Sequence, residues 1–164
     1  MTILSGKLLA DRICGNLKLR VDRLKESGVQ PELMIITSGD NDAGLVYVRN
    51  KIKRCKEIGI YPIVKHLHEL TDQDVAENCA ENKPIIFQMP MNGEVEPHDI
   101  TRYIDPMCDV DGFASKVNVA ALANGETPYH YPCTPKGIIR LLEASGVALS
   151  GKTVCVIGLS LIHI

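Results

Sequence analysis

Apolar residues recur at helical spacing in two long stretches of the chain, and each stretch predicts an amphipathic helix. The first covers residues 5–28, where Ser5 can cap the start and Gly28 can end the helix. Its stripe consists of Leu9, Ile13, Leu17, Val21 and Leu24. The second ends at Gly59, and its stripe consists of Leu45, Val48, Ile52 and Cys55. The loop 38–44 precedes this second helix.

Three short apolar runs alternate with the helical stretches and predict buried strands. The runs are 33–37, 60–64 and 84–88, and Thr71 can cap a further helix over 72–81 between the last two. A spacing of about 25 residues per strand is typical of βαβ units. The pattern therefore predicts an α/β fold with a parallel sheet.

The later part of the chain predicts one more helix and one more strand. Thr134 caps a helix that has Pro135 at its first position and that Gly146 ends. Asn118 and the region of Gly125 are predicted to be loop. Residues 151–158 look like a strand that opens a dinucleotide-binding unit, although a single glycine is a weak signal.

Tyr47 and Lys51 are four residues apart and therefore share one face of the second helix. This face lies about 100° from the apolar stripe, at the border of core and solvent. A phenol and an amine there can stack on a flat ligand and move a proton. The alternative is an exposed basic face whose tyrosine covers the edge of the core.

Gln88 and two aspartates are the other candidates for a site. Gln88 ends the third strand, at the edge where open parallel sheets bind ligands, but its amide could equally satisfy the following turn. Asp109 and Asp111 precede Gly112. A turn explains one of these carboxylates and leaves the other without an explanation.

Composition excludes several classes of function. The chain has 164 residues, a net charge of −2 and no Trp, which gives no general attraction to nucleic acid or membranes. Six cysteines without a CxxC pair argue against disulfides and zinc, and favour buried free thiols in a reducing compartment. Without a signal peptide or a long apolar run, the protein is expected in the cytoplasm.

Five motifs occur in order along the chain: Tyr47-Val-x-x-Lys51-x-Lys53 with Glu57-Ile-Gly59, Gln88-x-Pro90, Asp109-Val-Asp-Gly-Phe113, Pro132-Cys-Thr-Pro-Lys-Gly137, and Gly151-Lys with Val156-Ile-Gly158. Together they resemble the methylenetetrahydrofolate dehydrogenase/cyclohydrolase family over nearly the whole chain. The resemblance implies a three-layer αβα catalytic domain with a mostly parallel sheet over residues 1–120. It also implies an interdomain helix and the truncated start of a Rossmann-type NAD(P) domain, with its first strand, over residues 121–164.

The resemblance also implies the chemistry. The family oxidises methylenetetrahydrofolate with NADP and hydrolyses the methenyl product to formyltetrahydrofolate; NAD is the alternative cofactor. Lys51 is then the catalytic lysine, Tyr47 packs against the folate and Gln88 bonds within the site. Asp111 holds the pterin edge. Gly158 and Ser160 match cofactor-binding positions, no metal is implied, and the full-length enzyme is expected to be a homodimer.

Hydrolysis of the methenyl bridge requires a group that can move a proton between oxygen and nitrogen. An amine does this best when it can lose its proton near neutral pH. Partial burial and the neighbouring charge of Arg54 are expected to favour that loss at Lys51.

The chain also departs from the family pattern. Gly44, Asn92 and Ala120 stand where members usually carry Ser, Pro and Gly, which could loosen loops around the folate. After Gly158 the family continues with Arg-Ser, whereas this chain has residues 159–164, Leu-Ser-Leu-Ile-His-Ile. We expect a C-terminally truncated member whose last six residues are foreign and which lacks dehydrogenase activity by itself. The alternatives are a natural non-catalytic folate-binding module and a plain α/β interaction domain, which the motifs disfavour.

Overall fold

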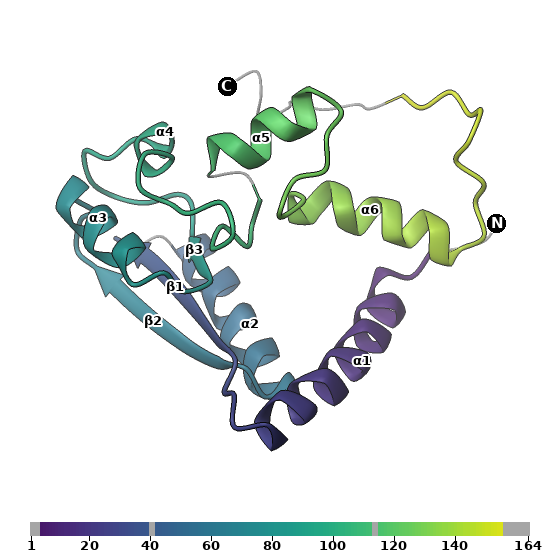
Figure 1. Ribbon diagram of the computed structural model, residues 1–164, viewed down its shortest axis with the longest axis horizontal. Helices are drawn as coiled ribbons and strands as arrows, with labels where there is room; N and C mark the ends of the chain where they lie inside the picture. Colours follow the sequence, from purple (N-terminus) through teal and green to yellow (C-terminus); the bar gives the residue numbers. More distant parts are fainter. Residues whose placement is uncertain (1–3, 40–41, 113–114, 156–164) are drawn as a thin grey trace.

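Three parallel strands form the centre of the computed structural model, which describes residues 4–39, 42–112 and 115–155 (Figure 1). The strands are β1 (Glu32–Ser38), β2 (Tyr61–Leu67) and β3 (Ile85–Phe87), in the order β2-β1-β3. Ile35 of the central strand lies opposite Val64 on one side and Ile86 on the other. All carboxyl ends therefore meet at one edge of the sheet.

Helices cover both faces of this sheet. The helices are α1 (Gly6–Glu26), α2 (Asp42–Ile58), α3 (Asp72–Ala80), α4 (Pro97–Ile100), α5 (Lys116–Ala123) and α6 (Cys133–Ala144). α2 packs on β1 and β2 and contacts α1, while α3 and α4 pack together over the other face. α6 contacts α1, so the chain closes back towards its start (Figure 1).

Alternate residues of the strands point into two apolar layers, as the period of two in a strand requires. Met34 and Ile36 face α3 and α4, in a buried cluster with Leu70, Val75, Cys79, Ile85, Phe87, Ile100 and Ile104. Ile35 is also fully buried, and its intervening position points it towards the α2 side, where Val48, Cys55 and Ile58 supply the apolar stripe. This arrangement confirms the predicted α/β class with helices on both faces of a parallel sheet.

Most predicted elements are confirmed with small changes in their ends. Ser5 caps α1, because its side chain accepts a hydrogen bond from Leu8 N. β2 runs three residues beyond the predicted end at Val64, through Lys65 and His66. It is an edge strand of the described sheet, where polar side chains can reach water.

Three predictions about local structure were wrong. α2 begins at Asp42, inside the predicted loop 38–44. α6 begins at Cys133, without a side-chain cap from Thr134. Pro135 therefore stands in the first turn, where a helix needs no N–H from it. Asn118 lies within α5 because tertiary hydrogen bonds, described below, hold it there.

The predicted strand at 151–158 is not seen in its described part, since residues 151–155 contain no strand. Residues 156–158 lie outside the described residues. All six cysteines are free. Cys55 and Cys79 are buried as predicted, whereas Cys133 and Cys155 are exposed, so the prediction of buried thiols was wrong for these two.

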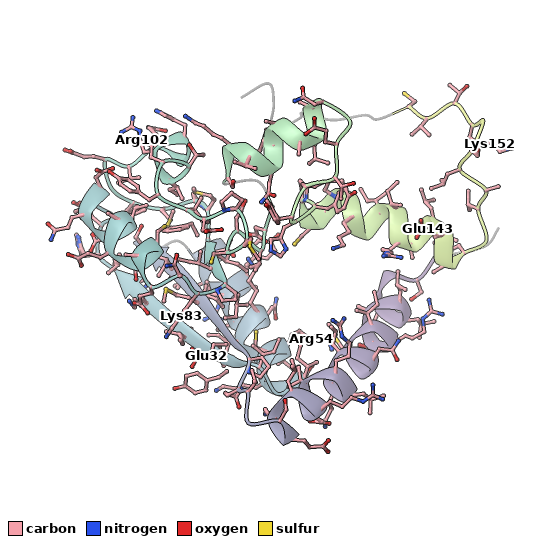
Figure 2. The ribbon with its side chains drawn as sticks, viewed as in Figure 1. Glu32, Arg54, Lys83, Arg102, Glu143 and Lys152 are labelled. Carbon is pink, nitrogen blue, oxygen red and sulfur yellow. The ribbon has the colours of Figure 1, made fainter. Side chains whose placement is uncertain are left out.

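Within the described part of the chain, no helix combines the length and the apolar character that a membrane crossing requires. At the sheet's amino end, an exposed ion pair links β1 to the start of β3. Lys83 Nζ lies 3.3 Å from Glu32 Oε2 (Figure 2). Its exposure makes it a minor contribution to stability.

A reciprocal cap at the start of α3 gives a test of this local analysis. Asp74 N donates to Thr71 Oγ1 at 3.1 Å, and Thr71 N donates to Asp74 Oδ2 at 3.0 Å. We predict that Thr71→Ala lowers the free energy of unfolding by about 1 kcal/mol in urea titrations at pH 7. Thr127→Ala, in an exposed loop, is the control and should change little.

The same cap predicts a pH dependence. Hydrogen bonds from the Thr71 side chain and backbone lower the pKa of Asp74. The charged cap therefore stabilises α3 fully above the ordinary aspartate pKa and is lost as the pH falls through the lowered value. The cost of Thr71→Ala should shrink in acid. A cost that stays constant or grows there would contradict this account of the cap.

Candidate functional site

Three polar side chains from separate segments meet at the carboxyl edge of the sheet. Lys51 Nζ of α2 donates a hydrogen bond of 2.8 Å to Gln88 Oε1, just beyond β3. The same ammonium lies 3.8 Å from Asp111 Oδ2. The structure thus brings together three of the four residues for which the sequence predicted a role in folate binding.

The helix pattern explains the position of Lys51. Val48 and Cys55 are buried against the sheet, and Lys51 lies between them in sequence but beside them on the helix. Its side chain is 31% exposed and that of Asp111 is 18% exposed. Lys51 therefore occupies the rim between core and solvent, as predicted, where a substrate can reach it.

Gln88 has a fixed orientation in this site. Its backbone N–H donates to Ile36 O at 2.8 Å and so continues the pairing of β3 with β1. Its side-chain Nε2 donates to Met89 O at 2.8 Å. Because the amide nitrogen is engaged by the chain, the amide oxygen is directed at Lys51. The amide nitrogen therefore satisfies the turn, and the amide oxygen faces Lys51 in the candidate site.

The two aspartates of the 109–113 motif have different roles. Asp109 is only 1% exposed and is the structural one. Its carboxylate accepts hydrogen bonds from Gly112 N at 3.1 Å, Ser115 N at 2.8 Å and Asn118 Nδ2 at 3.3 Å. Asp111 makes none of these turn contacts and is left to face Lys51. The carboxylate that a turn could not explain is therefore Asp111.

Asn118 joins three segments around this loop and was missed as a site-building residue. Its Nδ2 also donates to Pro106 O at 3.1 Å. Its Oδ1 accepts from Tyr129 N at 3.0 Å and from His130 N at 3.3 Å. Asn is a weak helix former, so local pattern predicted a loop. An asparagine nine residues after a buried aspartate gives no local signal of such a clamp.

Gly112 is required where this clamped segment passes the loop. Its φ is +73°, and an added Cβ would lie 2.6 Å from the backbone carbon of Tyr131. Neither the conformation nor the space admits a side chain. The close contact holds the segment before α6 directly against the Asp111 loop.

Cys133 is the second residue that sequence reasoning missed. Its Sγ donates to Val110 O at 3.7 Å, directly before Asp111 in the chain. Partial removal from water and the nearby Asp111 carboxylate raise the pKa of the Cys133 thiol. The thiol is thus a neighbour of the carboxylate that Lys51 faces. The 132–137 motif contained this residue, but only the three-dimensional fold pairs it with Asp111.

Arg54 is paired with two carboxylates. Its guanidinium lies 3.1 Å from Asp11 of α1 and 3.0 Å from Glu57, and Figure 2 shows it between α1 and α2. These two carboxylates raise the pKa of Arg54 and compensate its charge. The charged group closest to Lys51 is the Asp111 carboxylate. The expected influence of Arg54 on Lys51 therefore stays a prediction.

Tyr47 is 62% exposed and has no hydrogen bond or ring contact within the described residues. It lies one turn before Lys51 on α2, so its phenol borders the same rim. This position is open to a flat ligand. The predicted cofactor residues Gly158 and Ser160 lie outside the described residues.

The loop that carries the unusual Asn92 is held at its backbone. Ser38 Oγ donates to Asn92 O at 2.7 Å and accepts from Asn92 N at 2.7 Å. Leu70 N also donates to Asn92 O at 2.7 Å. These bonds counter the loosening expected at this position. In the described part of the chain, no three His, Cys, Asp or Glu side chains come together as a metal site.

Comparison with known proteins identifies the family. Residues 4–111 match the sequence model of the family described as "Tetrahydrofolate dehydrogenase/cyclohydrolase, catalytic domain". The chain belongs to this family. It is 37% identical over 167 residues to the "Bifunctional protein FolD" of Nautilia profundicola, in an alignment that covers 98% of this chain and 58% of the relative. The chain thus spans somewhat more than half the length of the curated relatives it matches.

Solved structures agree with this assignment. The bifunctional FolD enzyme of Campylobacter jejuni, a methylenetetrahydrofolate dehydrogenase/cyclohydrolase, superposes with a TM-score of 0.86 at 34% identity, covering 93% of this chain and 56% of that one. The Trypanosoma brucei enzyme, solved with NADP cofactor and an inhibitor, has a TM-score of 0.82 at 25% identity. That match covers 92% of this chain and 54% of the other.

The clamp around Asp109 predicts a large effect for one amide. Asn118→Ala would leave the Asp109 carboxylate and the N–H groups of Tyr129 and His130 short of partners. We expect the free energy of unfolding to fall by about 3 kcal/mol in urea titrations. Asn124→Ala, at the exposed end of α5, is the matched control. A loss below about 0.5 kcal/mol, the size of a surface substitution, would contradict the clamp.

Proposed function

We propose that this chain forms the folate site of a bifunctional methylenetetrahydrofolate dehydrogenase and methenyltetrahydrofolate cyclohydrolase. The single observation that supports this most is the contact of Lys51 with both Gln88 and Asp111 at the carboxyl edge of the sheet. An amine, an amide and a carboxylate there match the needs of a folate: proton movement at the one-carbon bridge and recognition of the pterin edge.

Asp111 is proposed to hold the pterin. The amino group and ring N–H of a pterin are adjacent donors, and a carboxylate can accept from both in a charge-assisted pair. The 3.8 Å between Asp111 Oδ2 and Lys51 Nζ is long for a charged hydrogen bond, so the carboxylate is free to turn to a ligand.

Lys51 is proposed to carry the hydrolytic proton transfers. Water attacks the cationic methenyl carbon, forms a carbon–oxygen bond and gives a proton to the neutral Lys51 amine. The resulting ammonium then protonates the ring nitrogen as its bond to that carbon breaks. The hydroxyl of the intermediate releases its proton to solvent as the carbonyl of the formyl product forms. Gln88 Oε1 keeps Nζ at the rim.

NADP belongs to the proposal as the hydride acceptor of the dehydrogenase step, with NAD as the alternative. The Trypanosoma brucei relative solved with NADP supports the choice. Gly158 and Ser160 stay predicted contacts of the cofactor. The part that the described residues play is to place the folate: Tyr47 is proposed to pack against its aromatic ring, next to Lys51, so that the one-carbon bridge is fixed in position.

Three further expectations complete the proposal. Residues 1–120 form the catalytic domain and residues 121–164 the interdomain helix and the start of the cofactor domain. The full-length protein is a homodimer, which light scattering can test. It works in the cytoplasm, a compartment that fits six free cysteines.

A fusion enzyme tests the role of Lys51. Residues 1–155 would replace the matching part of the Campylobacter jejuni relative, and methenyltetrahydrofolate hydrolysis would be followed by loss of its absorbance. We predict that Lys51→Met lowers kcat about 10²-fold or more, with KM changed only a few-fold, because an acid–base group is lost. Retention of more than about a tenth of kcat would contradict the assignment.

Two further variants of the fusion complete this test, one as a control and one for the role of Asp111. Lys53→Met, on the solvent side of the same helix, should keep the wild-type rate. Asp111→Ala should raise KM and weaken reduced-folate binding by about 1–3 kcal/mol, because the pterin donors lose their acceptor. If Asp111→Ala instead only lowers stability, the aspartate is a turn residue. Folate binding without any hydrolysis would favour a non-catalytic folate-binding module.

A further inference from the structure

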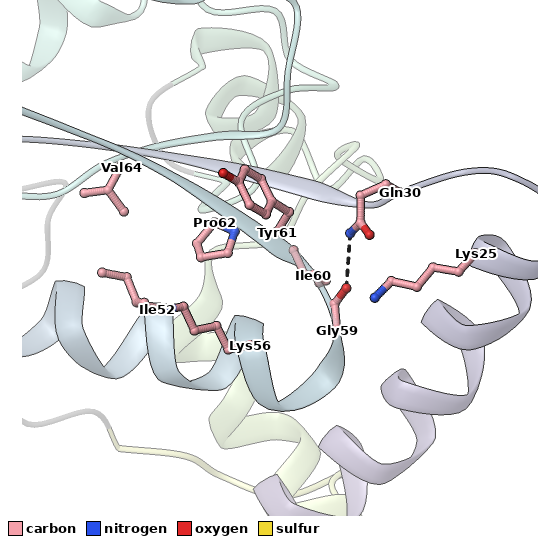
Figure 3. A pocket seen from close by; sticks show the side chains of 9 residues that line it. All are labelled: Lys25, Gln30, Ile52, Lys56, Gly59, Ile60, Tyr61, Pro62 and Val64. Atoms are coloured by element: carbon pink, nitrogen blue, oxygen red, sulfur yellow. Dashed lines mark hydrogen bonds between the residues drawn. The ribbon is translucent and has the colours of Figure 1, made fainter.

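A cavity lies at the opposite edge of the sheet from the candidate site of Lys51, Gln88 and Asp111. It has a volume of about 520 Å³ and is bounded by the last turns of α1 and α2 and the first residues of β2 (Figure 3). This volume is in the range of small-molecule sites. Because β2 is parallel to β1 and β3, its start lies at the amino edge, away from the folate site.

The charges that line this cavity are of one sign. Lys25 of α1 and Lys56 of α2 line it, and none of its lining residues is acidic. Within the described residues, neither ammonium has an ion-pair or hydrogen-bond partner. In contrast, Lys51, Lys53 and Arg54 of α2 are all paired with carboxylates.

The surrounding helices strengthen this positive character. α1 and α2 together contain eleven of the eighteen Lys and Arg residues but only five of the twenty Asp and Glu residues. A concave surface with cations on a low-dielectric wall concentrates anions near it. Lys25 and Lys56 lie in the last turns of their helices, where the helix dipole favours a cation. The dipole explains why each helix ends with a lysine, but it does not explain why both lysines border the same cavity.

The rest of the lining is apolar and open. Ile52 lies one turn before Lys56 on α2, and Pro62 and Val64 lie on the β2 side of the cavity (Figure 3). Val64 is 39% exposed although it lies in a strand. Pro62 has no N–H, so this part of the β2 edge lacks a donor for another strand. The wall therefore suits a flat apolar group rather than strand addition.

The floor of the cavity is held in place. Gln30 Nε2 donates to Gly59 O at 3.2 Å and to Pro31 O at 2.8 Å, which ties the α1–β1 connection to the α2–β2 connection (Figure 3). Gly59 has φ +89°, and an added Cβ would lie 3.0 Å from Lys25 Nζ and 3.1 Å from Val21 Cγ1. The end of the exposed Lys25 side chain thus lies beside Gly59 at the border of the cavity.

We propose that this cavity binds a small organic anion with a flat apolar body. The anionic group lies between Lys25 and Lys56, and the apolar body lies against Ile52, Pro62 and Val64. Two unpaired cations beside an uncharged apolar wall are the complement of such a molecule. This site is separate from the folate site and does not depend on the proposed function.

The test uses the 164-residue chain labelled with 15N and the probe 2-naphthoate. We expect saturable amide shifts confined to residues around Lys25, Lys56, Gly59 and Tyr61. The neutral isostere 2-naphthylmethanol and inorganic phosphate should each bind at least about tenfold more weakly, since each lacks one half of the recognition. Comparable affinity for either one would overturn the proposed pairing of charge and apolar surface.

Variants separate this site from general basic surface. The double variant Lys25→Met and Lys56→Met should weaken 2-naphthoate binding by at least about tenfold and leave reduced-folate binding unchanged. The control double variant Lys7→Met and Lys152→Met removes the same charge from exposed positions elsewhere and should bind like the wild type. Equal losses in both double variants, or shifts spread over all basic helices, would overturn the site.

Discussion

The buried carboxylate of Asp109 is the constraint on which the site depends. A charge removed from water is costly unless it is hydrogen-bonded, and Asp109 meets this need with donors from Gly112, Ser115 and Asn118. Asp109 also forms a bridge to Ile85 of β3, so the loop is fixed to the sheet. The geometry that satisfies this group turns Asp111 outwards. The Asp111 carboxylate is therefore placed by the needs of its buried neighbour.

The same network brings the segment before α6 to the edge of the sheet. Asn118 accepts from Tyr129 N and His130 N, and Gly112 lets the following backbone pass at close range. Cys133 is thereby brought to Asp111. α2 supplies the remaining side chain, because its apolar stripe fixes the rotation that leaves Lys51 at the rim. One helix, one strand end and one loop thus converge, each held by a different kind of interaction.

What the sequence could predict follows from how local each interaction is. Helical periodicity located α1 and α2, and short apolar runs located all three strands, because these patterns repeat within a few residues. Gln88 and Lys51 could be placed at one edge by the parallel topology. The roles of Asn118 and Cys133 could not be predicted, since their partners lie 9–12 and 22–23 residues away along the chain. The pairing of Arg54 could not be predicted for a related reason: its partner Asp11 lies on another helix. Motif resemblance supplied what local pattern could not, the folate that we propose as the ligand.

The central claim is that Asp111 holds a pterin while Lys51 faces its one-carbon bridge. A crystal structure of the chain with 5-formyltetrahydrofolate, a stable reduced folate, tests this most directly. The account predicts the amino group and ring N–H of the pterin at hydrogen-bond distance from the Asp111 carboxylate. It also predicts Lys51 Nζ next to the nitrogen that carries the formyl group and the benzoyl ring against Tyr47. A folate bound elsewhere, or one that leaves Asp111 paired only with Lys51, would contradict it.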